Sequence, residues 1–317
     1  MSLQSQLKAA SPGGPAVVTI GTFDGVHVGH ARLFSATVEL AGASSATSIA
    51  ITFRHPPRML LNPTLPVSHL CPLGERRSLI TAQGIDHVIE VDFDDSVRNI
   101  NADDFVRILM SELDMKGLVI GPGAAVGRDR GGDETRMKAL SQEIGFVLRV
   151  VPPAMVNGKV VRSTAIRAAL SAGDMASVSE MLGRAFSITG VVTEGDRRGR
   201  ELGFPTANIT PDPHGALPAD GIYATFVETD KGRYLAATNV GVRPTFEGGP
   251  RLIEPFLLDF EGDLYGHRIT VEFVERLREE ERFDTVDALI EQMNNDVKDT
   301  RRILGATRKK SGTPGAT

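Results

Sequence analysis

The chain of 317 residues has no tryptophan, three tyrosines and a single cysteine, Cys71. One cysteine excludes an intramolecular disulfide and is typical of proteins from a reducing compartment. No apolar run approaches the roughly 20 residues that a membrane-spanning helix needs. The first residues, MSLQSQLKAASPGGPA, lack the apolar centre of a signal peptide. We therefore expect a cytoplasmic protein without a membrane partner.

Charge of one sign does not dominate either. The chain has 35 lysines and arginines against 40 aspartates and glutamates, for a formal net charge of −5. The basic residues are spread along the chain, so we expect no nucleic-acid partner. With 41% hydrophobic and 24% charged residues, the composition is that of a soluble globular protein, and the length predicts about two domains.

Up to about residue 182, short apolar strands alternate with helical patterns. This alternation predicts an α/β domain with a Rossmann-like parallel sheet and helices on both faces. The expected strands are 17–20, 48–53, 87–91, 118–120 and 146–151, and the expected helices include 31–41, 76–82, 102–113 and 134–144. Ligands of such sheets bind beyond the carboxyl ends of the strands.

From about Phe186 the pattern changes to β-like runs separated by turn signals, such as FSITGVV, GIYATFV and RITVEFV. No helical pattern lies between these runs, so an antiparallel barrel or sandwich is predicted. A helix follows at 283–304, with Asp284 as the expected N-cap. We thus expect domains at 1–182 and 183–305, and a disordered tail at 306–317.

The stretch GTFDGVHVGH, residues 21–30, places His27 and His30 near the start of a predicted helix, after the first strand. The two imidazoles can converge on one ligand beside free backbone N–H groups that favour anions. Donation to a triphosphate would stabilise a pyrophosphate leaving group. One alternative is a plain strand-to-helix turn, in which Gly21, Gly25 and Gly29 serve backbone geometry. A metal site is a weaker alternative, because no carboxylate or cysteine ligand is near.

The same stretch resembles the H-x-G-H signature of nucleotidyltransferases, in the version carried by the bifunctional bacterial riboflavin kinase/FMN adenylyltransferases (FAD synthetases). In that family the FMN phosphate attacks the α-phosphorus of ATP, giving FAD and pyrophosphate. The segment VRSTAIRAAL, residues 161–170, is similar to the helix start S-S-T-x-I-R of the family, although alone it is equally an ordinary helix N-cap. The resemblance implies a catalytic site of His27, His30 and Arg167, and ATP-binding residues Gly21, Phe23, Asp24, Gly25, Ser163 and Thr164.

The stretch GVVTEGDRRGRELGFPTANI, residues 190–209, combines a glycine- and arginine-rich hairpin with a rigid turn at Pro205. Arginines on such a hairpin can cover a polyphosphate. The turn then presents Thr206 and Asn208 on one side of an extended segment, by the period of two. A hydroxyl and an amide oxygen suit a hard cation such as Mg²⁺ carried by ATP. The alternative is a charged hairpin followed by a proline turn, without a ligand.

This stretch also closely resembles the riboflavin kinase motif with the core G-F-P-T-A-N. The resemblance implies that Thr206 and Asn208 bind Mg²⁺ and the nucleotide phosphates, and that Gly195 and Arg200 belong to a flap over ATP. Glu254, in IEPFLLDF, would be the base that deprotonates the ribityl 5′-OH. The resemblance extends from about residue 17 to residue 303. It implies a nucleotidyltransferase domain followed by an antiparallel β-barrel kinase domain with a C-terminal helix.

The first module departs from the family pattern at three places. TFRHPP, residues 52–57, has the histidine shifted by one place, to His55, relative to the usual T-F-x-P-H-P. GPGAAVG, residues 121–127, has Gly123 where a polar residue is usual, and Ala124 and Val126 where aromatic residues are usual. VVRST, residues 160–164, has Val160 in the place of an arginine and Arg162 in the place of the first serine. Without the aromatic faces, stacking on the isoalloxazine ring is lost.

The leading interpretation is an enzyme that phosphorylates riboflavin to FMN and then adenylylates FMN to FAD. Its ligands would be ATP, riboflavin and FMN, with Mg²⁺ bound together with ATP. One alternative is a riboflavin kinase whose N-terminal module is degenerate or structural. The other is a flavin-sensing regulator without turnover, against which the intact kinase motif argues. The sequence pattern leaves the oligomeric state open.

Overall fold

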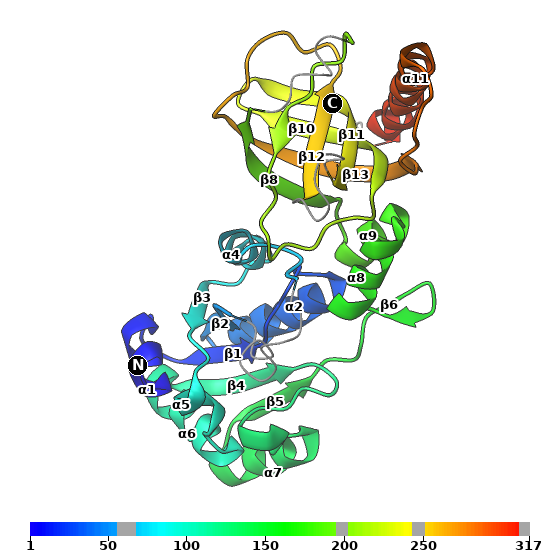
Figure 1. Cartoon of the computed structure of the whole chain (residues 1–317). Helices are drawn as coiled ribbons and strands as arrows, with labels where there is room; N and C mark the ends of the chain where they lie inside the picture. The colour runs from blue at the N-terminus through cyan, green and yellow to red at the C-terminus, as the bar shows by residue number, and fades with distance from the viewer. Residues whose placement is uncertain (56–67, 195–201, 243–250, 311–317) are drawn as a thin grey trace, which may run out of the picture. The chain divides into compact units, whose positions relative to one another are not determined.

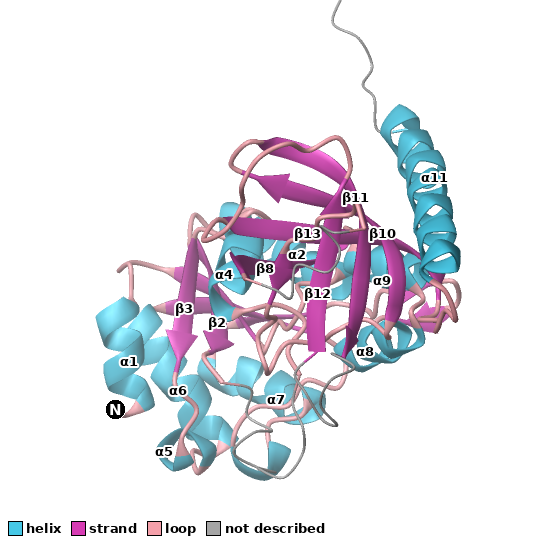
Figure 2. Cartoon of the chain, turned by 45° about the horizontal axis from the view of Figure 1, so that its top comes forward, coloured by secondary structure: helices cyan, strands magenta, loops and turns pink. Residues whose placement is uncertain are grey.

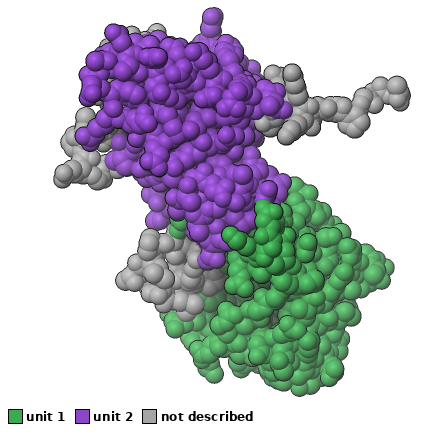
Figure 3. All heavy atoms as spheres, turned by 90° about the vertical axis from the view of Figure 1, so that its right-hand side faces the viewer, with its two compact units in different colours: residues 1–163 green, residues 164–317 purple. Residues whose placement is uncertain are grey.

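The computed structural model describes residues 1–55, 68–194, 202–242 and 251–310. The chain divides into two compact units, residues 1–163 and 164–317 (Figure 3). Within the described residues, no helix has both the length and the apolar character that a membrane crossing requires.

The first unit is built on five parallel strands in the order β3-β2-β1-β4-β5, with helices packed against the sheet (Figure 1). The strands are β1 (Ala16–Ile20), β2 (Thr47–Phe53), β3 (His87–Val91), β4 (Met115–Ile120) and β5 (Val147–Val150), followed by the hairpin β6 (Met155–Val156) and β7 (Lys159–Val160). The helices are α1 (Leu3–Ala10), α2 (Val28–Ala43), α4 (Leu73–Thr81), α5 (Asp95–Arg98), α6 (Ala102–Leu113) and α7 (Glu134–Ile144), with a 3₁₀ turn η1 (Arg128–Arg130). The predicted parallel α/β sheet is confirmed.

Helix α1 was not expected from the polar N-terminal sequence. Leu3 and Leu7, four residues apart, lie on one face of the helix and are fully buried in the core of this unit. The Ser2 side chain caps the helix by accepting a hydrogen bond from the backbone N–H of Ser5 at 3.3 Å. The two leucines and the buried Gln6, whose side chain accepts a hydrogen bond from the backbone N–H of Asp92, thus fix this short helix against the unit.

The sheet order places a topological switch point between β1 and β4. Strand β1 pairs with β2 on one side and β4 on the other, so the chain leaves these two neighbouring strands in opposite directions. A crevice forms beyond the carboxyl ends of strands at such a point. The residues that follow the two strands are Gly21 and Gly121. The histidine stretch therefore starts at the edge where this fold binds ligands.

The second unit is a closed six-stranded barrel in the order β10-β11-β12-β9-β8-β13, whose pairs are all antiparallel (Figure 2). Its strands are β8 (Phe186–Thr193), β9 (Asn208–Ile209), β10 (Gly221–Thr229), β11 (Gly232–Val242), β12 (Arg251–Leu257) and β13 (Arg268–Arg278). Helix α8 (Ser163–Ala172) begins at the border of the two units, and α9 (Met175–Leu182) precedes the barrel. Of the two predicted alternatives, an antiparallel barrel and a sandwich, the structure shows the barrel.

The last helix, α11 (Val286–Lys310), lies along the outside of the barrel. Leu304 is fully buried against Ala224 and Phe226 of β10. The expected N-cap Asp284 is wrong by one residue, because Thr285 Oγ1 accepts the hydrogen bond from the N–H of Ala288 at 3.2 Å. The helix also continues to Lys310, into the range expected to be a disordered tail, and residues 311–317 lie outside the described residues.

Candidate active sites

The first unit has a cavity of about 390 Å³ at the switch point. Its lining comes from the start of α2, the turn after β4 and the segment that runs from β5 into α8. The lining residues are His27, Gly29, His30, Leu33, Gly121, Pro122, Val151, Pro152, Pro153, Ala154, Val160, Val161, Arg162 and Ser163. The structure therefore brings His27, His30 and Ser163 into one cavity, as the sequence predicted.

His27 and His30 stack face to face, with ring centroids 3.6 Å apart and an angle of 17° between the rings. His27 is the N-cap of α2, and its Nδ1 accepts a hydrogen bond from the N–H of His30 at 3.3 Å. Burial holds the pKa of His30 well below its ordinary value of 6.5, and the neighbouring His27 and Arg76 lower this pKa further. His30 is therefore neutral near pH 7 and can offer a ligand an N–H group but no positive charge.

The glycines of this stretch make room for rings. A Cβ on Gly21 would lie 2.8 Å from the ring of Phe23, and one on Gly29 would lie 3.0 Å from the ring of His27. Gly25 has a φ of +80°, which favours glycine. Phe23 is buried and packs edge-on against His30, with ring centroids 5.3 Å apart. Phe23 thus packs against His30, and Gly21, Phe23 and Gly25 do not themselves line the cavity.

Asp24 is also buried, at 5% exposure, and does not line the cavity. Its Oδ1 accepts a hydrogen bond from the backbone N–H of Leu70 at 2.8 Å, and its carbonyl accepts one from Ser163 Oγ at 3.1 Å. Asp24 therefore fastens the turn to the segment that enters α8. Thr164 and Arg167, the other predicted residues of this motif, lie on α8 in the second compact unit.

The altered positions of the family pattern have distinct environments. Val160 and Arg162 both line the cavity, and Arg162 is the one permanently charged side chain in the described lining. Ala124 and Val126 are partly buried against the core of the unit. Gly123 has a φ of +67°, and a Cβ there would meet open space. This chain thus has an arginine in the cavity lining at position 162, two residues after the position at which the family pattern has one.

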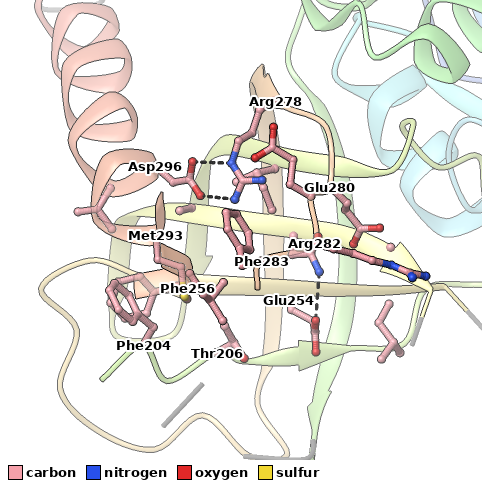
Figure 4. A pocket seen from close by; sticks show the side chains of 18 of the residues that line it. Phe204, Thr206, Glu254, Phe256, Arg278, Glu280, Arg282, Phe283, Met293 and Asp296 are labelled. Atoms are coloured by element: carbon pink, nitrogen blue, oxygen red, sulfur yellow. Dashed lines mark hydrogen bonds and ion pairs between the residues drawn. The ribbon is translucent and has the colours of Figure 1, made fainter. Parts of the chain in front are cut away.

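The barrel unit has a larger cavity, of about 670 Å³, between the barrel and α11 (Figure 4). Residues at alternate positions of two strands share its wall, as the period of two predicts: Ala237, Asn239 and Gly241 of β11, and Leu252, Glu254 and Phe256 of β12. The remaining lining residues are Phe204, Thr206, Asn208, Ile222, Val242, Arg278, Glu280, Glu281, Arg282, Phe283, Leu289, Met293, Asp296 and Val297. One part of the wall is apolar and aromatic, and the other carries hydroxyl, amide and carboxylate groups.

Thr206, Asn208 and Glu254, predicted from separate motifs, meet in this cavity. Asn208 is 6% exposed, and within the described part of the chain its Oδ1 is buried without a hydrogen-bond partner. An orphaned amide oxygen beside a threonine hydroxyl fits a hard cation such as Mg²⁺. The described residues contain no group of three or more histidine, cysteine, aspartate or glutamate residues that could bind a metal without a substrate. The predicted flap residues Gly195 and Arg200 lie outside the described residues.

The end of β13 and the segment after it contribute residues that the sequence patterns did not reveal. Arg278 forms a two-pronged ion pair with Asp296 of α11, at 2.9 and 2.8 Å, and the two side chains are only 16% and 7% exposed. This pair fastens the segment to the helix. Burial raises the pKa of Glu280, and a hydrogen bond from Asn239 opposes this shift. The signal for these residues was the charged run LREEERFD directly after a predicted strand.

The two units define a class: a parallel α/β unit with a histidine-lined cavity at its switch point, joined to a β-barrel unit with a carboxylate-containing cavity. A family model described as FAD synthetase matches residues 10–165, and one described as riboflavin kinase matches residues 182–304. The bifunctional riboflavin kinase/FMN adenylyltransferase of Pseudomonas fluorescens is 36% identical over 289 residues, which cover 90% of this chain and 92% of that protein. The one of Escherichia coli (strain K12) is 33% identical and covers 92% of this chain and 94% of that protein.

The fold is also found in a solved structure over nearly the whole chain. A crystal structure of a protein described as a macrolide-efflux protein from Streptococcus pneumoniae has a TM-score of 0.87 at 29% identity, covering 93% of this chain and 96% of that one. The chain belongs to the family of bifunctional riboflavin kinase/FMN adenylyltransferase enzymes. The resemblance seen in the sequence is thereby confirmed.

Proposed function

We propose that the chain phosphorylates riboflavin to FMN in the barrel cavity and adenylylates FMN to FAD at the switch point of the first unit. ATP is the donor in both steps. The functional domains are 1–182 and 183–305, a division supported by the matched segments, of which one ends at residue 165 and the other starts at residue 182. The convergence of Thr206, Asn208 and Glu254 in one cavity carries the proposal.

In the kinase step, Glu254 orients the ribityl 5′-OH and accepts its proton as the oxygen attacks the γ-phosphorus of ATP, and ADP leaves. Phe204 and Phe256, whose rings meet edge to face with centroids 5.2 Å apart, supply apolar surface for the flavin ring. Thr206 Oγ1 and Asn208 Oδ1 would hold Mg²⁺ together with the nucleotide phosphates. When bound, this cation neutralises phosphate charge.

In the adenylyl step, a phosphate oxygen of FMN attacks the α-phosphorus of ATP, and pyrophosphate leaves. The free N–H groups at the start of α2 and the imidazole N–H of His30 donate to the departing phosphates. Because His30 is neutral near pH 7, positive charge must come from another residue of the cavity. We assign this part to Arg162, which lines the cavity with the histidines. Ser163 provides a further donor, and Thr164 and Arg167 complete the proposed motif.

A second candidate is a riboflavin kinase whose first unit binds ATP without adenylyl transfer. One observation favours it: Ala124 and Val126, at positions where the family has aromatic residues, pack against the core and offer no ring surface for a flavin. Under this reading the histidine cavity retains its phosphate-binding half only.

Incubation of the purified protein with riboflavin, ATP and Mg²⁺, followed by chromatography of the flavins, separates the candidates. Formation of FAD supports both activities, FMN alone supports the second candidate, and neither product contradicts both. Glu254→Gln is expected to lower kcat for FMN formation by about 10²- to 10⁴-fold. Glu275→Gln, an exposed glutamate of β13 outside the cavity, is the matched control. The double variant His27→Ala with His30→Ala should lose FAD formation and keep FMN formation.

A further inference from the structure

Asn239 lies directly opposite Glu254 on the antiparallel pair β11 and β12. Its Nδ2 donates a hydrogen bond to Glu254 Oε2 at 3.4 Å, the bond drawn to Glu254 in Figure 4. Both side chains line the barrel cavity. The amide is therefore a direct neighbour of the carboxylate to which we assign the proton transfer.

A second carboxylate approaches the same amide. Glu280, from the segment after β13, also accepts a hydrogen bond from Asn239. Its carboxyl group lies against Gly241, where a Cβ would come within 2.7 Å of Glu280 Cδ. Gly241 follows Asn239 by two residues on β11 and so shares its face. The missing side chain at Gly241 is what lets the second carboxylate reach the amide.

Two carboxylates on one side fix the orientation of the Asn239 amide. Only its N–H groups can face two negative charges, because a turned amide would direct Oδ1 at them. Oδ1 consequently faces away from both carboxylates, and it is buried with no hydrogen-bond partner in the described part of the chain. A buried acceptor without a partner is costly, and the cost is removed when a ligand donates to it.

We propose that Asn239 Oδ1 accepts a hydrogen bond from the substrate hydroxyl adjacent to the one that Glu254 addresses. The inference rests on the proposed kinase function and adds a recognition rule to it: the site selects a terminal vicinal diol. The ribityl chain of riboflavin has such a pair in its 4′-OH and 5′-OH. A flavin with only the terminal hydroxyl leaves the buried acceptor unpaired and is rejected for that reason.

The test removes each partner of the proposed hydrogen bond in turn, the Asn239 amide and the 4′-OH of the flavin. For the full-length wild-type chain and for Asn239→Ala, kcat/KM for phosphorylation is measured with riboflavin and with 4′-deoxyriboflavin, and riboflavin affinity is measured by flavin fluorescence. Removal of the 4′-OH should lower kcat/KM about 10-fold in the wild type and hardly at all in Asn239→Ala, whatever that variant also loses because its amide no longer supports Glu254. Asn294→Ala, on the exposed side of α11, is the matched control.

Gly241→Ala provides a second variant that leaves Asn239 in place. It displaces the Glu280 carboxyl group, so it should weaken the use of riboflavin and leave the use of 4′-deoxyriboflavin nearly unchanged. Additive losses from Asn239→Ala and from the deoxy substrate would overturn the inference. So would a rise in KM for ATP alone, since it would assign the contact to the nucleotide ribose. If the wild-type chain phosphorylates neither flavin, the kinase assignment itself is refuted.

Discussion

Because the half-buried His30 is held in its neutral form, the first unit should lose stability as the pH falls. The pKa of His30 in the folded protein is held well below 6.5 by burial, and by the nearby His27 and Arg76. In the unfolded chain the same imidazole titrates near 6.5. Below that pH the unfolded state therefore binds more protons than the folded state, and the free energy of unfolding decreases with decreasing pH.

The size of the effect follows from this difference in proton binding. A group that titrates only in the unfolded state, at its ordinary pKa of 6.5, lowers the free energy of unfolding by about 1.4 kcal/mol when the pH falls from ~7.5 to ~5.5. The variant His30→Asn removes the titrating group and should abolish this part of the pH dependence. The comparison of the two proteins isolates the contribution of His30 from all other titrations.

The chain offers an internal control for the measurement. All three tyrosines, at positions 223, 234 and 265, lie in the second unit, and there is no tryptophan. In urea titrations, tyrosine emission follows the barrel unit, and far-UV circular dichroism follows both units. On acidification, the free energy of unfolding of the first unit should fall by about 1.4 kcal/mol more in the wild type than in His30→Asn. The transition followed by tyrosine emission should be the same in both proteins. The same pH slope in both proteins would refute the argument that His30 stays neutral.

Three further changes test separate parts of the structure. Asp296→Asn leaves the mostly buried Arg278 without its ion partner and should lower the free energy of unfolding of the barrel unit by about 3 kcal/mol, measured by tyrosine emission. Gly190→Ala places a methyl group onto the side chain that β9 presents to β8 and should cost about 1–3 kcal/mol in the same assay. Arg162→Ala should raise KM for ATP in FAD formation about 10-fold and leave FMN formation unchanged. Lys159→Ala, a change of equal charge outside the cavity, should alter neither activity.

Much of the fold could be predicted because its signals are local. The strand His87–Val91 and the helices Ala102–Leu113 and Glu134–Ile144 end where their patterns of apolar residues end. Helix α1 was missed because only two leucines mark its buried face. The N-cap of α11 was misplaced because an aspartate and a threonine stand side by side, and only the geometry decides which of them caps the helix.

The site residues also divide into those that a local motif predicts and those that only the tertiary structure brings together. His27 with His30, and Thr206 with Asn208, are close in sequence, so a motif contains the pair and local structure brings it together. Asn239 has no such neighbour. Its contact with Glu254 depends on the register of β11 against β12, and its contact with Glu280 depends on where the chain emerges from β13. Closure of the barrel decides both, and a linear pattern does not describe it.

The two cavities also differ in the groups that they offer to a phosphate. The first offers hydrogen-bond donors: the start of α2, the histidine pair and the guanidinium of Arg162. These groups can bind phosphate oxygens directly. The second presents oxygen atoms of Thr206, Asn208 and Glu254, besides Arg282 and the Arg278 that is paired with Asp296, and oxygen acceptors repel phosphate unless a cation lies between them. We therefore expect FMN formation in the barrel cavity to depend more strongly on the divalent ion that accompanies ATP than FAD formation in the histidine cavity.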